Sequence, residues 1–482
     1  MNTSLKFTTS ALALLGLTLG SCQPELDAPA AASAGEANFS TYIAVGNSLT
    51  AGYQSNGLSR EGQLNSYPNI LAGQFAQAGG GAFVQPLFAE NQANGSGYLR
   101  LAALTNGSPT LALVATNLAV VPGGSQNSGT NQLTRFTGTG NQNLGVPGIR
   151  VADVKTNGYG FNNPVGYNPF FERLLPATPP AALSSYLQYV QGQVAALKPT
   201  FFTNWLGNND VLGYATSGGV GAQLTTVADF TANYREVLDV LTAGGTKGLV
   251  ATIPNVTNVP LFTTVPTATV IAGINATPIP TALEPTIKTA LGLPQSSPLP
   301  TGLRFGFYIT TSAGKRLATP NDLLLLTAQS AINVPSTNPA QPFPSGVGLE
   351  LPGAPATTAA ALANASNALA SQFVLDATEV QAAVARTTEL NAVIRAEATS
   401  RNLALFDSNG FFARVAVSGI ATNAVDNQVA FIRGNLFSLD GVHPTSRGYA
   451  IIANEMITAI NAKYGSTLRQ VDANQYPGVA FP

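Results

Sequence analysis

The sequence of 482 residues contains one histidine, one cysteine and few charged side chains. The single cysteine, Cys22, excludes an intramolecular disulfide. With His443 and Cys22 as the only imidazole and thiol, the chain lacks the ligand set of a zinc enzyme, so no metal is expected. Charged residues make up 9% of the chain and the net charge is −1. Nucleic acid is therefore not expected as a partner, because such binding requires a basic face.

The sequence also lacks nucleotide-binding loops and, beyond the N-terminus, long apolar runs. No Gly-x-Gly-x-x-Gly opens a helix after a strand and there is no Walker loop, so no cofactor is expected. Beyond the N-terminus, no uninterrupted apolar run reaches the roughly 18 residues of a membrane-spanning helix. We therefore expect a mature protein that is soluble apart from any N-terminal anchor.

The N-terminus has the features of an export signal. A basic start ending at Lys6 precedes an apolar run over residues 11–19, which is too short to span a membrane. Leu-Gly-Ser before Cys22 resembles the lipobox of bacterial lipoproteins; the alternative is an incidental cysteine in an ordinary signal peptide. We expect residues 1–22 to be a lipoprotein signal peptide and Cys22 to be the lipidation site. The exported protein would be anchored to a membrane, the outer membrane on its periplasmic or surface side, through a flexible tether of residues 23–38.

Four short apolar runs that end at turn residues predict buried strands. These runs are residues 41–45, 201–206, 248–253 and 403–406. Helical patterns separate them, at residues 181–197 and 229–241 and with apolar positions at Val380, Val384, Leu390 and Ile394. Strands that alternate with helices predict an α/β fold whose parallel sheet is covered on both faces.

The last predicted helix has both ends marked in the sequence. Thr445 can cap its N-terminus and Gly465 ends it. Its buried face is expected to carry Tyr449, Ile452, Met456 and Ile460.

Two regions interrupt the alternation. Residues 79–140 are rich in Gly, Asn, Thr and Ser and predict loops with one or two hairpins. Residues 256–371 carry many Pro, Thr and Ala, with a strand expected at 303–310 and a helix at 359–370. Both regions are interpreted as insertions into an α/β core.

The expected domain organisation follows from these patterns. The core comprises residues 39–255 and 372–465. Residues 256–371 form an insertion large enough for a lid or subdomain, and residues 466–482 form a C-terminal tail.

Two distant segments carry the residues of a possible nucleophile and its base. Ser48 stands where the first strand should pass into a helix, at the carboxyl edge of the sheet, where ligands bind. Asp440 and His443 share one loop, so His443 can take a proton from a serine while Asp440 fixes its tautomer. Alone, a Gly-x-Ser is usually only a turn and an Asp-x-x-His a capping turn. Here no second histidine competes with His443.

Two further segments can supply hydrogen-bond donors to an oxyanion. Asn209 follows the second predicted strand, and its side-chain amide can donate, although Asn and Asp loops often bond their own backbone. Gly145 and Gly148 follow another likely strand, and a glycine N–H can approach a substrate closely.

In this order, the four segments resemble the sequence blocks of the SGNH/GDSL hydrolases. Ser48 matches the nucleophile of Gly-Asp-Ser-Leu, and Gly148 and Asn209 match the glycine and asparagine of blocks II and III. Asp440 and His443 match the Asp-x-x-His of block V. The resemblance covers the predicted core and is carried by the ordered set rather than by any single piece.

The resemblance implies a flavodoxin-like three-layer α/β/α fold and a triad of Ser48, His443 and Asp440. It also implies an oxyanion hole made of the Ser48 and Gly148 N–H groups and the Asn209 side chain. The expected function is that of an esterase or lipase, which hydrolyses carboxylic esters through an acyl-enzyme without metal or cofactor. Its partner would be an ester substrate, a lipid or an acylated glycan, and the insertion would shape the acyl or alcohol pocket.

The sequence departs from the family pattern at Asn47, which stands where the family has Asp. That residue is not a triad member in the family, so the expected mechanism is retained while loop geometry or rate can differ. The Gly-x-Ser-x-Gly elbow of α/β-hydrolases is absent, because Thr50 occupies its last position.

Two alternatives remain open at the level of sequence. One is a carbohydrate O-deacetylase of the same fold, since fold does not choose between acylated glycans and lipids. The other is a non-catalytic surface lipoprotein that binds glycan or lipid, whose signature would be a missing catalytic residue.

Overall fold

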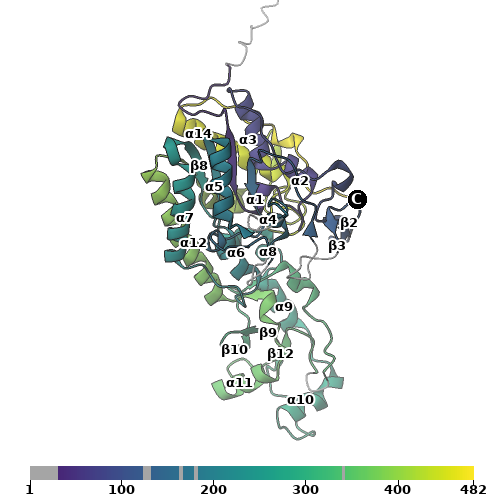
Figure 1. Cartoon of the computed structure of the whole chain (residues 1–482). Helices are drawn as coiled ribbons and strands as arrows, with labels where there is room; N and C mark the ends of the chain where they lie inside the picture. The colour runs from purple at the N-terminus through teal and green to yellow at the C-terminus, as the bar shows by residue number, and fades with distance from the viewer. Residues whose placement is uncertain (1–30, 123–131, 162–166, 178–182, 339–341) are drawn as a thin grey trace, which may run out of the picture. The chain divides into compact units, whose positions relative to one another are not determined.

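A five-stranded parallel sheet forms the centre of the structure (Figure 1), a computed structural model that describes residues 31–122, 132–161, 167–177, 183–338 and 342–482. Its strands are β1 (Tyr42–Gly46), β6 (Asn143–Gly145), β7 (Phe201–Trp205), β8 (Lys247–Ala251) and β14 (Ala404–Phe406). They lie in the order β14-β8-β7-β1-β6, and every neighbouring pair is parallel. The predicted mixed α/β class with a central parallel sheet is confirmed. Cys22 and the predicted signal peptide lie outside the described residues.

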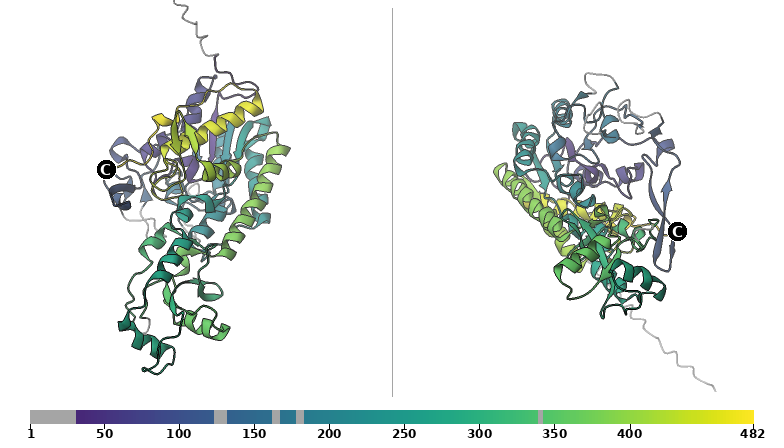
Figure 2. Two further views of the ribbon diagram at one scale, coloured as in Figure 1. Left: turned by 180° about the vertical axis from the view of Figure 1, so that it is seen from behind. Right: turned by 90° about the horizontal axis from the view of Figure 1, so that it is seen from below.

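Helices lie on both sides of this sheet. On one side α7 (Val227–Leu241) packs against both α5 (Tyr186–Leu197) and α12 (Ala377–Ser400). On the other, α14 (Ser446–Tyr464) packs on β14 and on α3 (Tyr67–Ala76), and Figure 2 shows α14 in front of the sheet when it is seen from behind. With both faces covered, β1 and β7 are buried along their whole length, which explains their nearly continuous apolar sequences.

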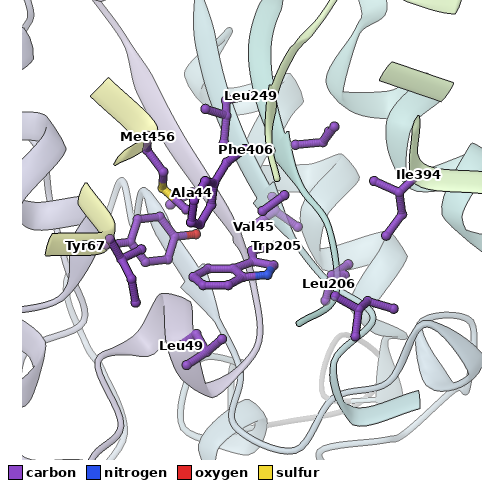
Figure 3. Packing of buried hydrophobic residues seen from close by; sticks show 14 of the residues in the cluster. Ala44, Val45, Leu49, Tyr67, Trp205, Leu206, Leu249, Ile394, Phe406 and Met456 are labelled. Atoms are coloured by element: carbon purple, nitrogen blue, oxygen red, sulfur yellow. The ribbon is translucent and has the colours of Figure 1, made fainter. Parts of the chain in front are cut away.

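The core between these layers is rich in aromatic side chains. Figure 3 shows Tyr67 and Met456 on one side of the strands and Ile394 on the other. The Trp205 ring packs edge-on against Tyr67 and Phe406, with centroids 5.7 Å away in both cases, and its indole N–H donates to a backbone carbonyl at 3.0 Å. This packing satisfies the polar end of the buried indole.

The predicted apolar stripe of α12 needs one correction. Leu390 and Ile394 are fully buried, but Val384 is 36% exposed, and the buried position is Ala383. Steps of three or four residues from Ile394 lead back through Leu390 and Thr387 to Ala383, so Val384 lies about 100° around the helix from the buried face. Helix α14 agrees with its prediction: the Thr445 side chain accepts from Gly448 N–H, and Gly465 ends the helix in the left-handed conformation.

Residues 79–140 contain the expected hairpins. The longer one pairs β2 (Tyr98–Thr105) with β3 (Ser108–Val114), and a second, short pair joins β4 (Val120–Val121) to β5 (Gln132–Leu133). Asn106 and Gly107 connect β2 to β3 with φ of 51° and 82°, the positive values that tight hairpin turns require.

The insertion has a hydrophobic cluster of its own. Strands β10 (Gly314–Leu317), β9 (Arg304–Thr311) and β12 (Val347–Glu350) form an antiparallel sheet, with helices α9 (Thr267–Ala276), α10 (Glu284–Ala290) and α11 (Ala356–Ala365) around it. The helix predicted to run to residue 370 ends at Ala365, because Asn367 and Leu369 form β-bridges to Val347 and Ile309.

Both chain ends of the described core pack on α14 and its surroundings. In the predicted tether, Glu36 N–H donates to Tyr464 O at 2.7 Å and Ala37 is buried. In the predicted tail, Leu468 and Ala473 belong to the main hydrophobic core. The end of the predicted tether and the start of the predicted tail are therefore part of the folded unit. No helix among the described residues is long and apolar enough to cross a membrane.

Candidate active site

Ser48 lies directly after the carboxyl end of β1, as the first residue of the short helix α1 (Ser48–Ala51). Asn47 caps this helix through its Oδ1, which accepts from Leu49 N–H at 3.0 Å. Gly46 is required by close packing, because a Cβ there would lie 2.0 Å from Thr50 Oγ1 and 3.0 Å from the Trp205 carbonyl oxygen. The strand-to-helix turn therefore fixes Ser48 at the edge of the sheet, where only 6% of its surface is exposed.

The structure brings Ser48, His443 and Asp440 into one hydrogen-bonded chain. The Ser48 Oγ lies 2.9 Å from His443 Nε2, although the two residues are separated by 395 positions. On the other side of the ring, His443 Nδ1 lies 3.0 Å from Asp440 Oδ2. This is the order in which a serine, its base and the carboxylate that orients the base must stand.

The Asp440 carboxylate is held by backbone N–H groups. Its Oδ1 accepts from Val442 and His443 N–H at 2.9 and 2.8 Å, and its Oδ2 accepts from Asn56 N–H at 2.8 Å. Burial raises the pKa of this carboxyl group, but the neighbouring His443 and the accepted hydrogen bonds outweigh burial and lower the pKa to about 2. Asp440 is therefore ionised at neutral pH, as a group that stabilises an imidazolium must be.

An aromatic contact that the sequence analysis missed also positions the imidazole. The Tyr53 ring lies 4.8 Å from the His443 ring, and Phe170 packs edge-on against Tyr53 at 5.9 Å. Tyr449 of α14 donates to the Tyr53 carbonyl oxygen at 2.6 Å. The only sequence signal for Tyr53 is that it closely follows α1. Its contact with a ring 390 positions later depends on tertiary packing.

Of the two candidate glycines, only Gly148 is free to meet a ligand. Gly145 lies within β6, where a Cβ would come within 2.4 Å of Ala51 N, so this glycine is needed for packing under α1. Gly148 is exposed in the turn that follows, with φ of 85°. Val146 N–H donates to the Gly46 carbonyl oxygen at 3.0 Å, and this bond ties the Gly148 turn to the end of β1, next to Ser48.

Asn209 lies beside that turn. It is the first residue of α6 (Asn209–Thr216), which begins after the short loop that follows β7, and its Nδ2 donates to Ile149 O at 2.9 Å. One amide hydrogen is engaged in this bond, which leaves the second for another acceptor. The three residues expected at an oxyanion hole thus follow three adjacent strands, β1, β6 and β7.

Asp210, to which the sequence analysis gave no role, connects two of these loops. Its carboxylate accepts from Val151 and Ala152 N–H at 2.8 and 3.1 Å and from Thr225 Oγ1 at 2.7 Å. Burial raises the pKa of Asp210 to about 6, although the same hydrogen bonds lower it. Asp210 therefore anchors the chain after Gly148 to the helix that begins with Asn209.

The side-chain amide of Asn47 makes a hydrogen bond through its oxygen but not through its nitrogen. Its Oδ1 caps α1, but its buried Nδ2 has no hydrogen-bond partner within the described part of the chain. An aspartate, which has no donor, would not leave a buried N–H unpaired at this position.

The insertion contacts the loop that carries the histidine, residues 438–444, hereafter the histidine loop. Leu261 of α8 (Pro260–Thr263) donates its N–H to Gly441 O at 2.9 Å. Gly441 has φ of 71°, and a Cβ there would lie 2.9 Å from Leu261 N, so a glycine permits this close approach. The insertion is therefore in contact with the residues between Asp440 and His443.

Within the described residues, no group of three or more His, Cys, Asp or Glu side chains is placed to hold a metal ion. No family model and no curated protein matches the sequence.

Proposed function

We propose that this protein is a serine esterase of the SGNH/GDSL type that hydrolyses carboxylic esters through an acyl-enzyme. The observation that carries the proposal is the chain from Ser48 Oγ through the His443 ring to the Asp440 carboxylate, with contacts of 2.9 and 3.0 Å. This hydrogen-bonded series of side chains includes the only histidine of the sequence. Asp440, with a pKa of about 2, is ionised where an ester hydrolase would work.

The topology supports the same family. Numbered along the chain, the five strands lie in the order 2-1-3-4-5, which is the flavodoxin-like order of doubly wound sheets. In such sheets ligands bind beyond the carboxyl ends of the strands. Ser48, Gly148 and Asn209 all follow strands at that edge.

In the proposed reaction, Ser48 Oγ attacks the ester carbonyl carbon while its proton passes to His443 Nε2. Asp440 stabilises the imidazolium through Nδ1–H. The N–H groups of Ser48 and Gly148 and the Asn209 amide would donate to the oxyanion, and loss of one such donor typically costs about 3 to 4 kcal/mol in the barrier. The proton then moves from Nε2 to the departing alkoxide, which leaves as the alcohol. Water, activated by His443, cleaves the acyl-enzyme and releases the acid.

The site of action is part of the proposal. With residues 1–22 as a lipoprotein signal and Cys22 as the lipidated residue, the enzyme would be held at a membrane as an exported bacterial lipoprotein. Its substrate would then be a lipid or acylated glycan near that surface.

The test is hydrolysis of p-nitrophenyl esters from acetate to palmitate by the purified protein and three variants. Ser48→Ala and His443→Ala should each lower kcat by at least about 10³-fold, and Asp440→Asn by about 10⁴-fold because an amide holds the wrong tautomer. Ser330→Ala, which removes an exposed hydroxyl in the insertion, is the matched control and should retain wild-type kcat.

The chain-length profile separates the two enzymatic candidates. Activity restricted to acetate would favour a carbohydrate O-deacetylase, and activity on long chains a lipase. A folded wild type without activity on any ester would contradict the proposal and favour the non-catalytic lipoprotein.

A further inference from the structure

A cavity lies among four segments that are distant in the sequence. It is lined by the tip of the β2–β3 hairpin, by the end of α8, by η7 (Leu326–Ser330) and by the turn at residues 430–433. Its volume is about 320 Å³, within the range of small-molecule pockets. Neither Ser48 nor His443 lines it, so it is distinct from the candidate active site.

The wall at residues 430–433 has a strained backbone. Ile432 has φ of 67°, a value that β-branched residues rarely adopt, and Arg433 N–H donates to Phe431 O at 2.7 Å across a three-residue turn. The Ile432 side chain is buried in a small cluster with Leu101 and Leu439. Strain of this kind persists only where the surroundings impose it, and it is concentrated at ligand sites. Here it accompanies two residues, Phe431 and Arg433, that line the cavity.

The lining combines apolar surface with an unpaired cation. Leu104, Pro109 and Phe431 supply apolar surface. Within the described residues, Arg433 is exposed and has no ion pair, and the Gln329 amide has no hydrogen bond. A guanidinium presents a planar set of donors that fits a carboxylate or a phosphate. The complementary ligand is therefore a small molecule with an apolar body and an anionic end.

Three of the walls also contact the histidine loop. On α8, Leu261 N–H donates to Gly441 O, and on η7, Leu326 Cδ2 would lie 3.5 Å from a Cβ at Gly441. The turn packs Ile432 against Leu439 of the same loop. A ligand in the cavity would therefore contact elements that also pack against the histidine loop.

We propose that this cavity is a second ligand site, for a small amphiphile whose carboxylate or phosphate pairs with Arg433 and whose apolar part lies against Phe431, Leu104 and Pro109. Because the readout is binding, the proposal stands apart from the proposed esterase activity.

The test is calorimetric titration of the purified full chain with octanoate, octyl phosphate and octanol. The first two share an apolar tail and differ in the anionic group, and octanol has no charge. Arg433→Gln removes the cation from an exposed position, and Thr263→Trp fills the cavity from another exposed position. Arg100→Gln, on the same hairpin but outside this cavity, is the matched control.

We expect saturable binding of at least one anionic amphiphile, weakened about tenfold or more by Arg433→Gln and by Thr263→Trp and unchanged by Arg100→Gln. The preferred anion would identify the ligand as a carboxylic acid or a phosphate ester. Absence of saturable binding, equal binding of octanol, or binding that Ser48→Trp abolishes while Arg433→Gln leaves it intact would each overturn the proposal.

Discussion

At the scale of single residues, the imidazole of His443 is held from three directions. Ser48 contacts Nε2, Asp440 contacts Nδ1, and the ring of Tyr53 packs against the ring of His443. The first two contacts are hydrogen bonds that the reaction itself would use. The third is a packing contact, so its contribution lies in orientation and is separable by mutation.

Replacing Tyr53 tests that contact. Tyr53→Ala should lower kcat by roughly ten- to a hundredfold, because a base displaced by even about 1 Å loses its alignment with the nucleophile. Tyr53→Phe keeps the ring and should retain near wild-type kcat, since the hydroxyl makes only a 3.5 Å contact with Asn56. The measurement is kcat and KM on a short p-nitrophenyl ester. Equal activity of both variants would assign Tyr53 no positioning role.

Asp210 predicts a pH dependence of stability. Its pKa, raised by burial to about 6 from an ordinary value of 3.8, means that the folded state binds more protons than the unfolded state between these values. Its contribution to the free energy of unfolding is thus complete below pH 3.8 and is lost as the pH rises through 6. Asp440, whose pKa is lowered to about 2 in the folded state, also titrates at about pH 4 in the unfolded state, but it is present in both the wild type and an Asp210 variant, so its contribution cancels when the two are compared.

The measurement is urea unfolding of the wild type and of Asp210→Asn at pH 4, 5, 6 and 7. The variant lacks the titrating group, so the stability difference between the two proteins should shrink by up to about 3 kcal/mol from pH 4 to pH 7. A difference that is constant with pH would show that Asp210 does not titrate in this range.

At the scale of elements, the histidine loop is supported by α8, an element from another part of the chain. The contact is a backbone hydrogen bond from Leu261 to Gly441, made where Gly441 has positive φ and no side chain. The loop also bonds to itself, since Ser438 N–H donates to His443 O at 2.8 Å. Its position relative to Ser48 therefore depends on both internal and external contacts.

Gly441→Ala tests the external contact. The new Cβ would meet Leu261 N at 2.9 Å in addition to the strain of positive φ, so α8 and the loop must separate. We expect a loss of about 2 kcal/mol or more in stability and a fall in kcat that exceeds any change in KM.

Gly302→Ala is the matched control for that change. Gly302 also has positive φ, 83°, but a Cβ there has no neighbour within 4 Å. The Gly302→Ala variant should lose only the stability that the backbone strain costs, with kcat unchanged. If both variants lose activity equally, the contact with α8 is not what positions the loop.

At the scale of the whole molecule, the insertion is partly continuous with the core. Its sheet and helices enclose a separate hydrophobic cluster, but Leu261, Phe262 and Leu325 belong to the main core. Strand β11 (Leu323–Leu324) pairs with β13 (Val374–Leu375), which lies beyond the predicted end of the insertion.

This continuity predicts the result of deleting residues 256–371. Each buried apolar side chain that is lost removes roughly 1.5 to 3 kcal/mol of burial, so the deletion should abolish cooperative unfolding as well as activity. Thermal unfolding monitored by circular dichroism measures this. A deleted protein that still unfolds cooperatively, with altered ester preference only, would show that the insertion is a separable lid.

The sequence by itself determined the features that depend on close neighbours in the chain. The four strands, the helix after Ser48, the Thr445 cap and the shared loop of Asp440 and His443 all follow from short-range patterns. Strand ends and caps are set within a few residues, so local sequence contains the necessary information.

Only the tertiary structure decided which of these pieces meet. It left Gly148 exposed, whereas the space around Gly145 is filled by Ala51. It placed Asn56 N–H on the Asp440 carboxylate across 384 positions and Leu261 on Gly441. On α12, it placed Ala383 rather than Val384 on the buried face. These contacts depend on strand order and on how helices pack against the sheet, and periodicity along one segment does not encode the partner that a side chain meets from another.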